Sequence, residues 1–408
     1  MTPIRSKENF LVFGSPLIED EAINEVVKCL KTGWIGTGPR AAEFETAFAA
    51  YKGVQGGLAL NSCTAALHLS LLVAGIKPGD EVITTPMTFC ATINTILHAG
   101  GTPVLADVDP ETMNIDPDAI ERCITPRTRA ILPVHFAGRA CDMDRIMDIA
   151  RRHNLKVIED CAHAIETEYK GKKAGTFGDF SCFSFYSTKN IVTGEGGMLF
   201  ARRKEDLARA KILGLHGMSK DAWKRFGGEG FKHYEVTECG FKYNMMDMQA
   251  CLGIQQLKRV EEYWDRRASI WEQYMEAFDG LPVDLPAPVE ARTRHAYHLF
   301  TLLIDEERAG ISRDEFVDHM THNGVGVGVH YLSLPEHPYY QQALGWRPED
   351  YPNAYRIGRQ TVSLPISAKL SSADVADVIA AVSSAFESGM SIPKGIPRRP
   401  SHHSALHV

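Results

Sequence analysis

The sequence predicts an α/β protein with a mostly parallel central sheet covered by helices, followed by a smaller α+β domain. Between residues 56 and 215, short apolar runs alternate with helical patterns, which is typical of parallel strands joined by crossover helices. A long helical pattern from about residue 246 to 278 then leads to a segment with new strand and helix signals. We therefore expect a large domain over residues 1–245, and a connecting helix with a small domain over residues 246–390.

The individual elements follow from apolar runs that are bounded by turn and capping residues. Strands of the central sheet are expected at residues 57–60, 81–85, 103–106, 130–135, 156–158, 179–186 and 197–201, and helices at 64–73, 88–98, 142–153 and 204–213. In the small domain we expect strands at 297–304 and 325–330 and helices at 312–322 and 372–387, the first capped by Ser312 and the second by Ser371 or Ser372. A polar, Gly-rich insertion occupies residues 219–232, and residues 391–408 have the composition of a disordered tail.

Composition narrows the classes of function. The 408 residues are 44% hydrophobic and 23% charged, as in a globular enzyme, and the net charge of −7 argues against nucleic acid or an anionic membrane as a partner. No run of about 18 apolar residues is present, and the first residues, MTPIRSKENF, lack the apolar core of a signal peptide. The nine cysteines form no C-x-x-C pair. We therefore expect reduced thiols and a cytoplasmic protein without a membrane segment.

Two polar features follow predicted strands, at the edge where open α/β sheets build their sites. The segment NSCT at residues 61–64 lies between a strand and a helix, where free N–H groups and the helix dipole can bind an anion. An ordinary N-cap by Ser62 or Thr64 is the alternative. Asp160 follows an apolar strand, and a carboxylate held there can pair with a pyridinium nitrogen and keep it protonated. A helix-capping aspartate is the alternative for this residue.

A lysine and an aromatic residue complete the pattern. Lys189 comes just past the predicted strand at 179–186, in a hydroxyl-rich turn beside the Gly-rich loop at 193–197. Partial burial would lower the pKa of its amine and free it to act as a nucleophile and a base, whereas a surface lysine is the alternative. Phe89, at another strand–helix junction, can stack on a cofactor ring or belong to the core. Each feature alone is weak, but their order along the chain is specific.

With its features in this order, the chain resembles the fold type I enzymes that use pyridoxal 5′-phosphate (PLP), and within them the DegT/DnrJ/StrS family of sugar aminotransferases. The resemblance extends from about Gly14 to Ala385. The matching motifs are TGWIGTGP, NSCTAALHLSL, PGDEVITTPMTF, GGTPVLADVDP, VIEDCAHA, FSFYSTKN with IVTGEGG, GFKYNMMDMQACLG, GVGVHY and SLPIS. The lysine motif with its GEGG loop and the motif GFKYNMMDMQA are the most specific. The resemblance implies the three-layer architecture of PLP fold type I.

The resemblance also implies roles for individual residues. Lys189 resembles the lysine that binds PLP as a Schiff base, and Asp160 resembles the partner of the pyridine nitrogen. The other residues that resemble cofactor-binding positions are Phe89 (stacking on the ring), His163 (beside the ring, near its phenolic oxygen), Cys63 through its backbone, Thr64 and Ser184 (phosphate clamp), and Asn244 (reaching the cofactor of the neighbouring subunit). A homodimer with shared active sites is therefore implied. The family often has Gly or Ala at position 63, so the cysteine there fits only if its N–H makes the contact.

The family's activity implies transfer of an amino group from L-glutamate to C4 of a nucleotide-activated keto-sugar, a step of amino-sugar biosynthesis such as that for cell-surface polysaccharide. The Gly-rich stretch with Trp34, Ile35 and Gly36 predicts a rim for the bulky nucleotide, although a tight connector is the alternative. His330 and Tyr331 can close over the other side of the substrate. The run from residue 311 to 331 looks most like enzymes that make UDP-4-amino-4-deoxy-L-arabinose, so a UDP-linked sugar is favoured over GDP- or dTDP-linked ones.

Other classes of protein fit the sequence less well. Residues 33–38 have the wrong glycine spacing for a dinucleotide-binding loop, and residues 171–173 lack the upstream glycine and following hydroxyl of a P-loop. The sixteen histidines form no H-E-x-x-H motif, and we expect no metal site, including at His330 and His337. A PLP-binding sensor or scaffold without turnover stays open as an alternative. A sugar dehydratase of the same fold would carry histidine in place of Lys189.

Overall fold

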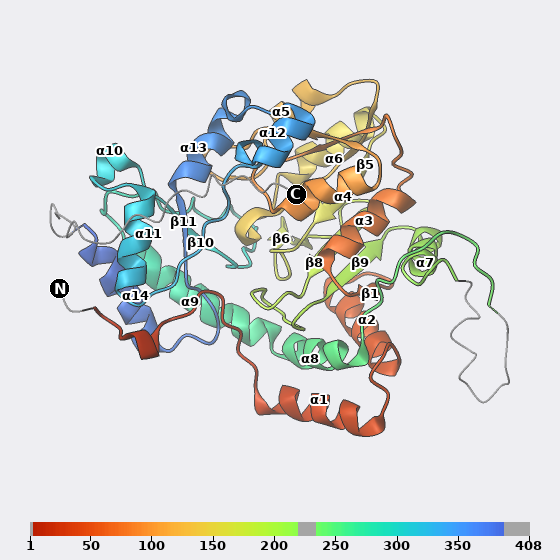
Figure 1. The fold of residues 1–408 in the computed structure, drawn as a ribbon, viewed down its shortest axis with the longest axis horizontal. Coiled ribbons are helices and arrows are strands. Elements are labelled where there is room, and N and C mark those ends of the chain that lie inside the picture. Colours follow the sequence, from red (N-terminus) through yellow and green to blue (C-terminus); the bar gives the residue numbers. More distant parts are fainter. Residues whose placement is uncertain (1–2, 219–233, 387–408) are drawn as a thin grey trace, which may run out of the picture.

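The computed structural model describes residues 3–218 and 234–386, so the expected insertion at 219–232 and the tail at 391–408 lie outside the described residues. Its central sheet has seven strands in the order β1-β9-β8-β5-β4-β2-β3 (Figure 1). The strands are β1 (Leu58–Leu60), β2 (Glu81–Thr84), β3 (Thr102–Leu105), β4 (Thr128–Ile131), β5 (Lys156–Asp160), β8 (Phe180–Ser184) and β9 (Gly197–Ala201). Strand β9 runs antiparallel to its neighbours β1 and β8, and all other neighbours are parallel. The predicted mostly parallel sheet is confirmed.

Helices cover both faces of this sheet and give the fold three layers (Figure 1). One face carries α3 (Cys63–Val73), α4 (Cys90–His98) and α7 (Lys204–Leu213), and the other carries α2 (Pro39–Lys52), α5 (Pro117–Cys123), α6 (Met143–Arg152) and α8 (Asp247–Lys258). Because both faces are covered, every residue of β2 and β8 is buried, with no alternation of buried and exposed positions. The expected three-layer α/β architecture is therefore confirmed.

A second core lies around the connecting helix α9 (Val260–Ala277) and the antiparallel pair β10 (Phe300–Leu303) and β11 (Thr361–Leu364). Helices α11 (Arg313–His322) and α14 (Ser372–Ser384) pack on this pair, and Ser312 and Ser371 cap them as expected. The remaining elements are α1 (Asp20–Thr32), the hairpin β6 (Glu168–Tyr169) and β7 (Lys172–Lys173), α10 (Glu306–Ala309), α12 (Pro338–Leu344) and α13 (Pro352–Gln360). No helix of the described part is long and apolar enough to cross a membrane.

Three expectations about this half of the chain need correction. The helix expected at 246–278 is two helices, because Arg259 leaves helical geometry at φ −111° and ψ 8°. Residues 325–330 form no strand; they make isolated bridges from Val325 to Leu11 and from Gly328 to Ser363. The alternating glycines of that segment have no side chains to pack on a sheet, which weakens a strand. Strand β11 was not expected, although its residues TVSL include the β-branched Thr361 and Val362 and all four are buried.

Candidate active site

The predicted site residues gather at one edge of the central sheet. Leu60, Gly197 and Ser184 lie in register across β1, β9 and β8, and Asp160, the last residue of β5, pairs with Cys182. Strands β1, β5 and β8 therefore end at the same edge. The segments that follow them carry the NSCT turn, Asp160 with His163, and Lys189. This convergence is what the alternation of strands and helices predicts for an open α/β sheet.

The NSCT turn is built as an anion-binding helix start. The Ser62 side chain accepts a hydrogen bond from the Ala65 N–H at 3.1 Å, so Ser62 is the N-cap of α3. Helix geometry leaves the first N–H groups, which include those of Cys63 and Thr64, without intrahelical partners. A Cβ on Gly197 would lie 2.4 Å from the Ser62 carbonyl carbon, so only glycine lets β9 pass this turn. The N–H groups, the helix dipole and the glycine fit a phosphate group.

Asp160 is fixed in a buried position at the end of β5. The residue is 4% exposed, and burial raises the pKa of its carboxyl group. One carboxylate oxygen accepts the Ala162 N–H at 3.1 Å, and the other accepts the hydroxyl of Thr92 at 3.1 Å. Thr92 comes from α4 and was not among the expected residues. A buried carboxylate whose ionised form is costly is well suited to a cationic partner such as a protonated pyridine nitrogen.

Lys189 lies five residues beyond the end of β8, and its backbone N–H donates to the Tyr186 carbonyl at 2.9 Å. Burial lowers the pKa of its amine to about 8, while the charge of Asp160 acts in the opposite direction. An amine with this pKa is partly neutral near pH 7 to 8 and can act as a nucleophile. Lys189 is half-buried, as expected.

Imidazole and phenol groups line the side of the site that faces the small domain. His163 Nδ1 accepts the Ala137 N–H at 3.3 Å, so its neutral ring carries the proton on Nε2 and donates it to the Tyr331 hydroxyl at 3.2 Å. The ring of His298 lies 4.4 Å from that of His163 between centroids. Burial and the charge of Lys189 lower the pKa of His163 and His298, and lower that of His330 to about 4. All three imidazoles are therefore neutral at pH 7.

Phe89 and Ser184 are two further residues that were expected to bind the cofactor. Phe89 precedes the first residue of α4, its side chain is 59% exposed, and its ring lies 6.4 Å from that of Tyr331. Phe89 is therefore no core residue, and its face is available for stacking. Ser184 is buried, and its Oγ accepts the Tyr186 N–H at 3.3 Å, so its own proton remains to be donated.

Trp34, Ile35, Gly36 and Asn244 lie together in a different place. They line an open cavity of about 830 Å³, which also includes Asn61 from the NSCT turn. The Asn244 amide donates to the Thr37 hydroxyl, and its Oδ1 is buried without a hydrogen-bond partner among the described residues. His330 and Tyr331 do not line this cavity. Within one chain, the expected substrate residues therefore lie in two places: Trp34, Ile35 and Gly36 line this cavity, whereas His330 and Tyr331 lie outside it.

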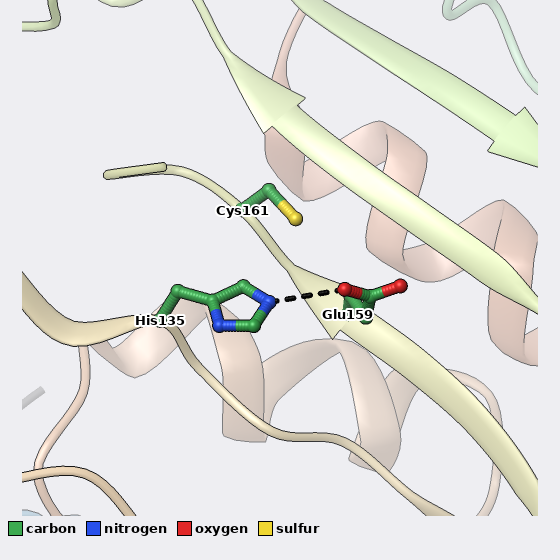
Figure 2. Close-up of side chains that lie close together, drawn as sticks. All are labelled: His135, Glu159 and Cys161. Atoms are coloured by element: carbon green, nitrogen blue, oxygen red, sulfur yellow. Dashed lines mark hydrogen bonds and ion pairs between the residues drawn. The ribbon is translucent and has the colours of Figure 1, made fainter. Parts of the chain in front are cut away.

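A buried trio of His135, Glu159 and Cys161 has ligand atoms within 4.8 Å of one another (Figure 2). Glu159 already accepts the N–H groups of Gly175 at 2.7 Å, Phe177 at 2.8 Å and Gly178 at 2.7 Å. His135 Nε2 faces the same carboxylate at 3.1 Å, and its Nδ1 accepts the Cys141 N–H at 3.1 Å. These hydrogen bonds satisfy the His135 imidazole and the Glu159 carboxylate without a metal ion. We interpret the trio as an anchor that ties β4 and β5 to the loop before β8.

Sequence reasoning missed Thr92, His135 and His298. His135 is the last residue of the strand predicted at 130–135 and His298 lies near the start of the one predicted at 297–304, which is a signal that could have singled them out. Thr92 lies inside α4, and no local pattern distinguishes it from other helical residues. The residues that were expected nevertheless form a set with four complementary parts: free N–H groups for a phosphate, a carboxyl for a pyridine nitrogen, an amine for an aldehyde and an exposed ring for stacking. This donor set fits PLP.

Comparison with known proteins decides the family. Residues 16–383 match the model of the DegT/DnrJ/EryC1/StrS aminotransferase family. The chain belongs to this family. The spore coat polysaccharide biosynthesis protein SpsC of Bacillus subtilis is 47% identical over 380 residues, which are 93% of this chain and 98% of that protein.

Solved structures agree with this assignment. A Streptococcus pneumoniae protein described as a sugar aminotransferase, Spr1654, superposes in its apo form with a TM-score of 0.85 at 33% identity, covering 92% of this chain and 98% of that one. It has also been solved in PLP and PMP (pyridoxamine phosphate) forms. The aminotransferase PseC of Helicobacter pylori, involved in pseudoaminic acid biosynthesis, gives 0.86 at 29% identity, covering 93% and 99%. The protein is therefore a PLP-dependent sugar aminotransferase.

Proposed function

We propose that this aminotransferase transfers an amino group from L-glutamate to C4 of a nucleotide-linked 4-keto-sugar, with a UDP-linked sugar favoured. The observation that carries the proposal is the wall of neutral hydrogen-bonding rings beside Lys189, formed by His163, His298, His330 and Tyr331. Neutral imidazole and phenol groups suit the hydroxyls and the apolar faces of a sugar.

In this proposal each residue at the sheet edge has a separate role. The N–H groups of Cys63 and Thr64 with the Ser184 hydroxyl bind the cofactor phosphate, Asp160 holds the proton of its ring nitrogen, and Phe89 packs on its face. PLP, when bound, withdraws electrons from the reacting carbon and carries the amino group between the two substrates. The Lys189 amine takes the proton from the α-carbon of glutamate in the first half of the reaction, and it supplies a proton to C4 of the sugar in the second.

We further propose that the enzyme works as a homodimer in which Asn244 reaches the site of the partner subunit. Three exposed apolar residues, Ile23, Val27 and Leu30, recur at helical spacing along α1 and continue into the exposed Trp34 and Ile35. An apolar stripe of this kind is typical of a surface that a second subunit covers. The unpaired Oδ1 of Asn244 lies beside the same surface.

Relatives support a role in making surface sugars. The B. subtilis relative SpsC is named for spore coat polysaccharide biosynthesis, and PseC is described as acting in pseudoaminic acid biosynthesis. We therefore propose that the product is an amino-sugar precursor of a cell-surface polysaccharide, made in the cytoplasm.

The substrate class can be tested in the second half-reaction alone. The holoenzyme is first converted to its amine form with L-glutamate, and the excess glutamate is removed. UDP-, dTDP- and GDP-linked 4-keto-hexoses and the UDP-linked 4-keto-pentose are then offered separately, with pyruvate and oxaloacetate as controls. We expect the visible cofactor band to return fastest with a UDP-linked sugar. If it returns with the keto-acids and with none of the nucleotide sugars, the sugar proposal is wrong while the PLP chemistry stands.

The first step of the same experiment tests the alternative of a PLP-binding sensor or scaffold. A protein without turnover would keep its visible band when L-glutamate is added, whereas an aminotransferase loses it. Because Lys189 occupies the position where related sugar dehydratases carry histidine, we do not favour dehydration.

A further inference from the structure

Asn190, the residue next to Lys189, is held by three partners from two separate segments. Its side-chain Nδ2 donates to Glu166 Oε2 at 2.8 Å and to the Ala296 carbonyl at 3.0 Å. Its Oδ1 faces His298 Nδ1 at 2.9 Å. The amide orientation is determined chemically, because a carboxylate and a carbonyl only accept hydrogen bonds, so the nitrogen must face them. His298 Nδ1 must then carry the proton and donate it to Asn190.

Glu166 is in turn fixed by an ion pair inside the protein. Its Oε1 accepts a hydrogen bond from Arg267 Nη2 at 2.6 Å, and the two side chains are 0% and 4% exposed. Arg267 also donates from Nε to the Ala296 carbonyl at 3.3 Å, so it binds the same two acceptor groups as Asn190. A buried guanidinium held by two acceptors has little freedom to rearrange. Asn190 thus rests on a rigid support supplied by α9.

The backbone of residues 296–298 also contributes to holding Asn190. Tyr297 adopts a left-handed conformation with φ of +50°, which is uncommon for a bulky residue. Its two neighbours are Ala296, whose carbonyl accepts from Asn190, and His298, whose ring donates to Asn190. A left-handed residue between them turns both groups toward the same side chain. Outliers of this kind cluster at functional sites.

These contacts have a direct consequence for Lys189. We propose that Asn190 is a positioning residue that fixes the direction in which Lys189 presents its amine, and that His298 and the Glu166–Arg267 pair hold Asn190 in place. Asn190 itself carries no charge, so its contacts act on the direction of the Lys189 side chain. Arg267 belongs to α9, and His298 belongs to the segment before β10. The position of Lys189 therefore depends on the connecting helix and the small domain as well as on its own sheet.

A matched set of variants tests this role in the holoenzyme. Asn190→Ala removes all three hydrogen bonds. His298→Leu removes the donor to Asn190, and His298→Asn has nearly the shape of leucine but restores a donor near the position of Nδ1. Thr167→Val serves as the control for stability: Thr167 is buried, its hydroxyl donates to the Gly138 carbonyl at 2.7 Å, and that carbonyl keeps the Ala296 N–H as a donor.

Two readouts separate positioning from folding. The first is the visible circular dichroism of the lysine-bound cofactor, which reports its orientation. The second is the single-turnover rate at which L-glutamate or L-glutamine, whichever reacts with the unsubstituted holoenzyme, bleaches the band. We expect Asn190→Ala and His298→Leu to weaken the dichroism and to slow bleaching by about tenfold to a hundredfold, as small misplacements of a reacting group do. His298→Asn should recover much of the loss, and Thr167→Val should lower only the unfolding midpoint.

The inference is wrong if Asn190→Ala and His298→Leu bleach at the unsubstituted rate, if His298→Asn is no faster than His298→Leu, or if Thr167→Val slows bleaching as much as they do. It rests on the proposed attachment of the cofactor to Lys189, so Lys189→Ala is measured alongside. A band that survives Lys189→Ala overturns the attachment and this inference together. Neither readout uses a sugar acceptor, so a wrong sugar assignment leaves the result intact.

Discussion

The carboxylate of Asp247, at the start of α8, accepts the backbone N–H of Gly38 at 2.7 Å across a sequence separation of 209 residues. It also accepts the N–H groups of Arg40 at 3.1 Å and Ala41 at 3.0 Å. Gly38 is the N-cap of α2 and has no side chain to cap the helix itself. Asp247 therefore supplies the missing cap from a distant segment, and its own N–H donates to Gly36 at 2.9 Å. This contact holds the stretch around Gly36 beside Asn244.

Asp247→Ala should lower the free energy of unfolding by about 2 kcal/mol, because it leaves buried N–H groups without an acceptor. Asp247 is 1% exposed, so water cannot easily replace the carboxylate. Asp247→Asn keeps one acceptor oxygen and should cost less. Urea unfolding of both variants measures the difference. A loss below about 0.5 kcal/mol for the alanine variant, the range of ordinary surface substitutions, would contradict the capping role.

Lys189→Ala should abolish the visible band of the lysine-bound cofactor and reduce turnover by several orders of magnitude, as loss of a nucleophile that is also the base commonly does. Absorbance after reconstitution with PLP and a transamination assay measure the two effects. Lys52→Met is a suitable control, since Lys52 is also a buried lysine and burial lowers its pKa to about 8. If Lys189→Ala retains both the band and near-normal activity, the attachment site lies elsewhere.

Asp160→Asn should leave PLP bound but slow the half-reaction with L-glutamate, because a neutral amide cannot stabilise a protonated ring nitrogen. The amide can still pair with Thr92 and with the Ala162 N–H, so the fold at this position is preserved. Stopped-flow absorbance gives the rate, and PLP content gives the occupancy. An unchanged rate would mean that Asp160 only stabilises the turn after β5.

Local sequence predicted the parts of the site that one segment builds alone. The NSCT turn, Asp160 and Lys189 each lie at or a few residues beyond the end of a strand, and parallel strands bring such positions to one edge whatever lies between them. Phe89 was placed at its junction for the same reason. The order of these residues, combined with the family resemblance, was therefore enough to predict the sheet and the residues that cluster at its end.

Contacts between distant segments were not predictable in the same way. The cap that Asp247 provides for Gly38 and the bond between Asn190 and His298 depend on how helices and domains pack, which no local pattern encodes. The break at Arg259 was missed because both helices continue the same apolar spacing. The sequence pattern of residues 325–330 predicted a strand, yet these residues pair only through single bridges to Leu11 and Ser363.

The lowered pKa of Lys189 predicts how its reactivity depends on pH in the cofactor-free protein. Burial disfavours the ammonium form, so the neutral amine should reach half its maximum near pH 8, compared with about 10.4 for an exposed lysine. Asp160 favours the ammonium form, so Asp160→Asn should move this midpoint to lower pH. Trace labelling with an amine reagent, read for the peptide that carries Lys189 by mass spectrometry, measures both values. A midpoint near that of an exposed lysine, or an upward shift in the variant, would contradict the environment described for this amine.

The cross-subunit role of Asn244 predicts complementation between two inactive variants. In a shared site, Lys189 comes from one chain and Asn244 from the other, so a heterodimer of Lys189→Ala with Asn244→Ala has one site with both lesions and one with neither. Mixing the variants under conditions of subunit exchange should therefore restore activity, up to about one quarter of the unsubstituted value, because random exchange makes half the dimers mixed and each has one intact site. Exchange is verified independently with chains carrying different affinity tags. If both residues served the same chain's site, each site of the heterodimer would carry one lesion and the mixture would stay inactive after confirmed exchange, which would refute the proposed reach of Asn244 while leaving the chemistry at Lys189 untouched.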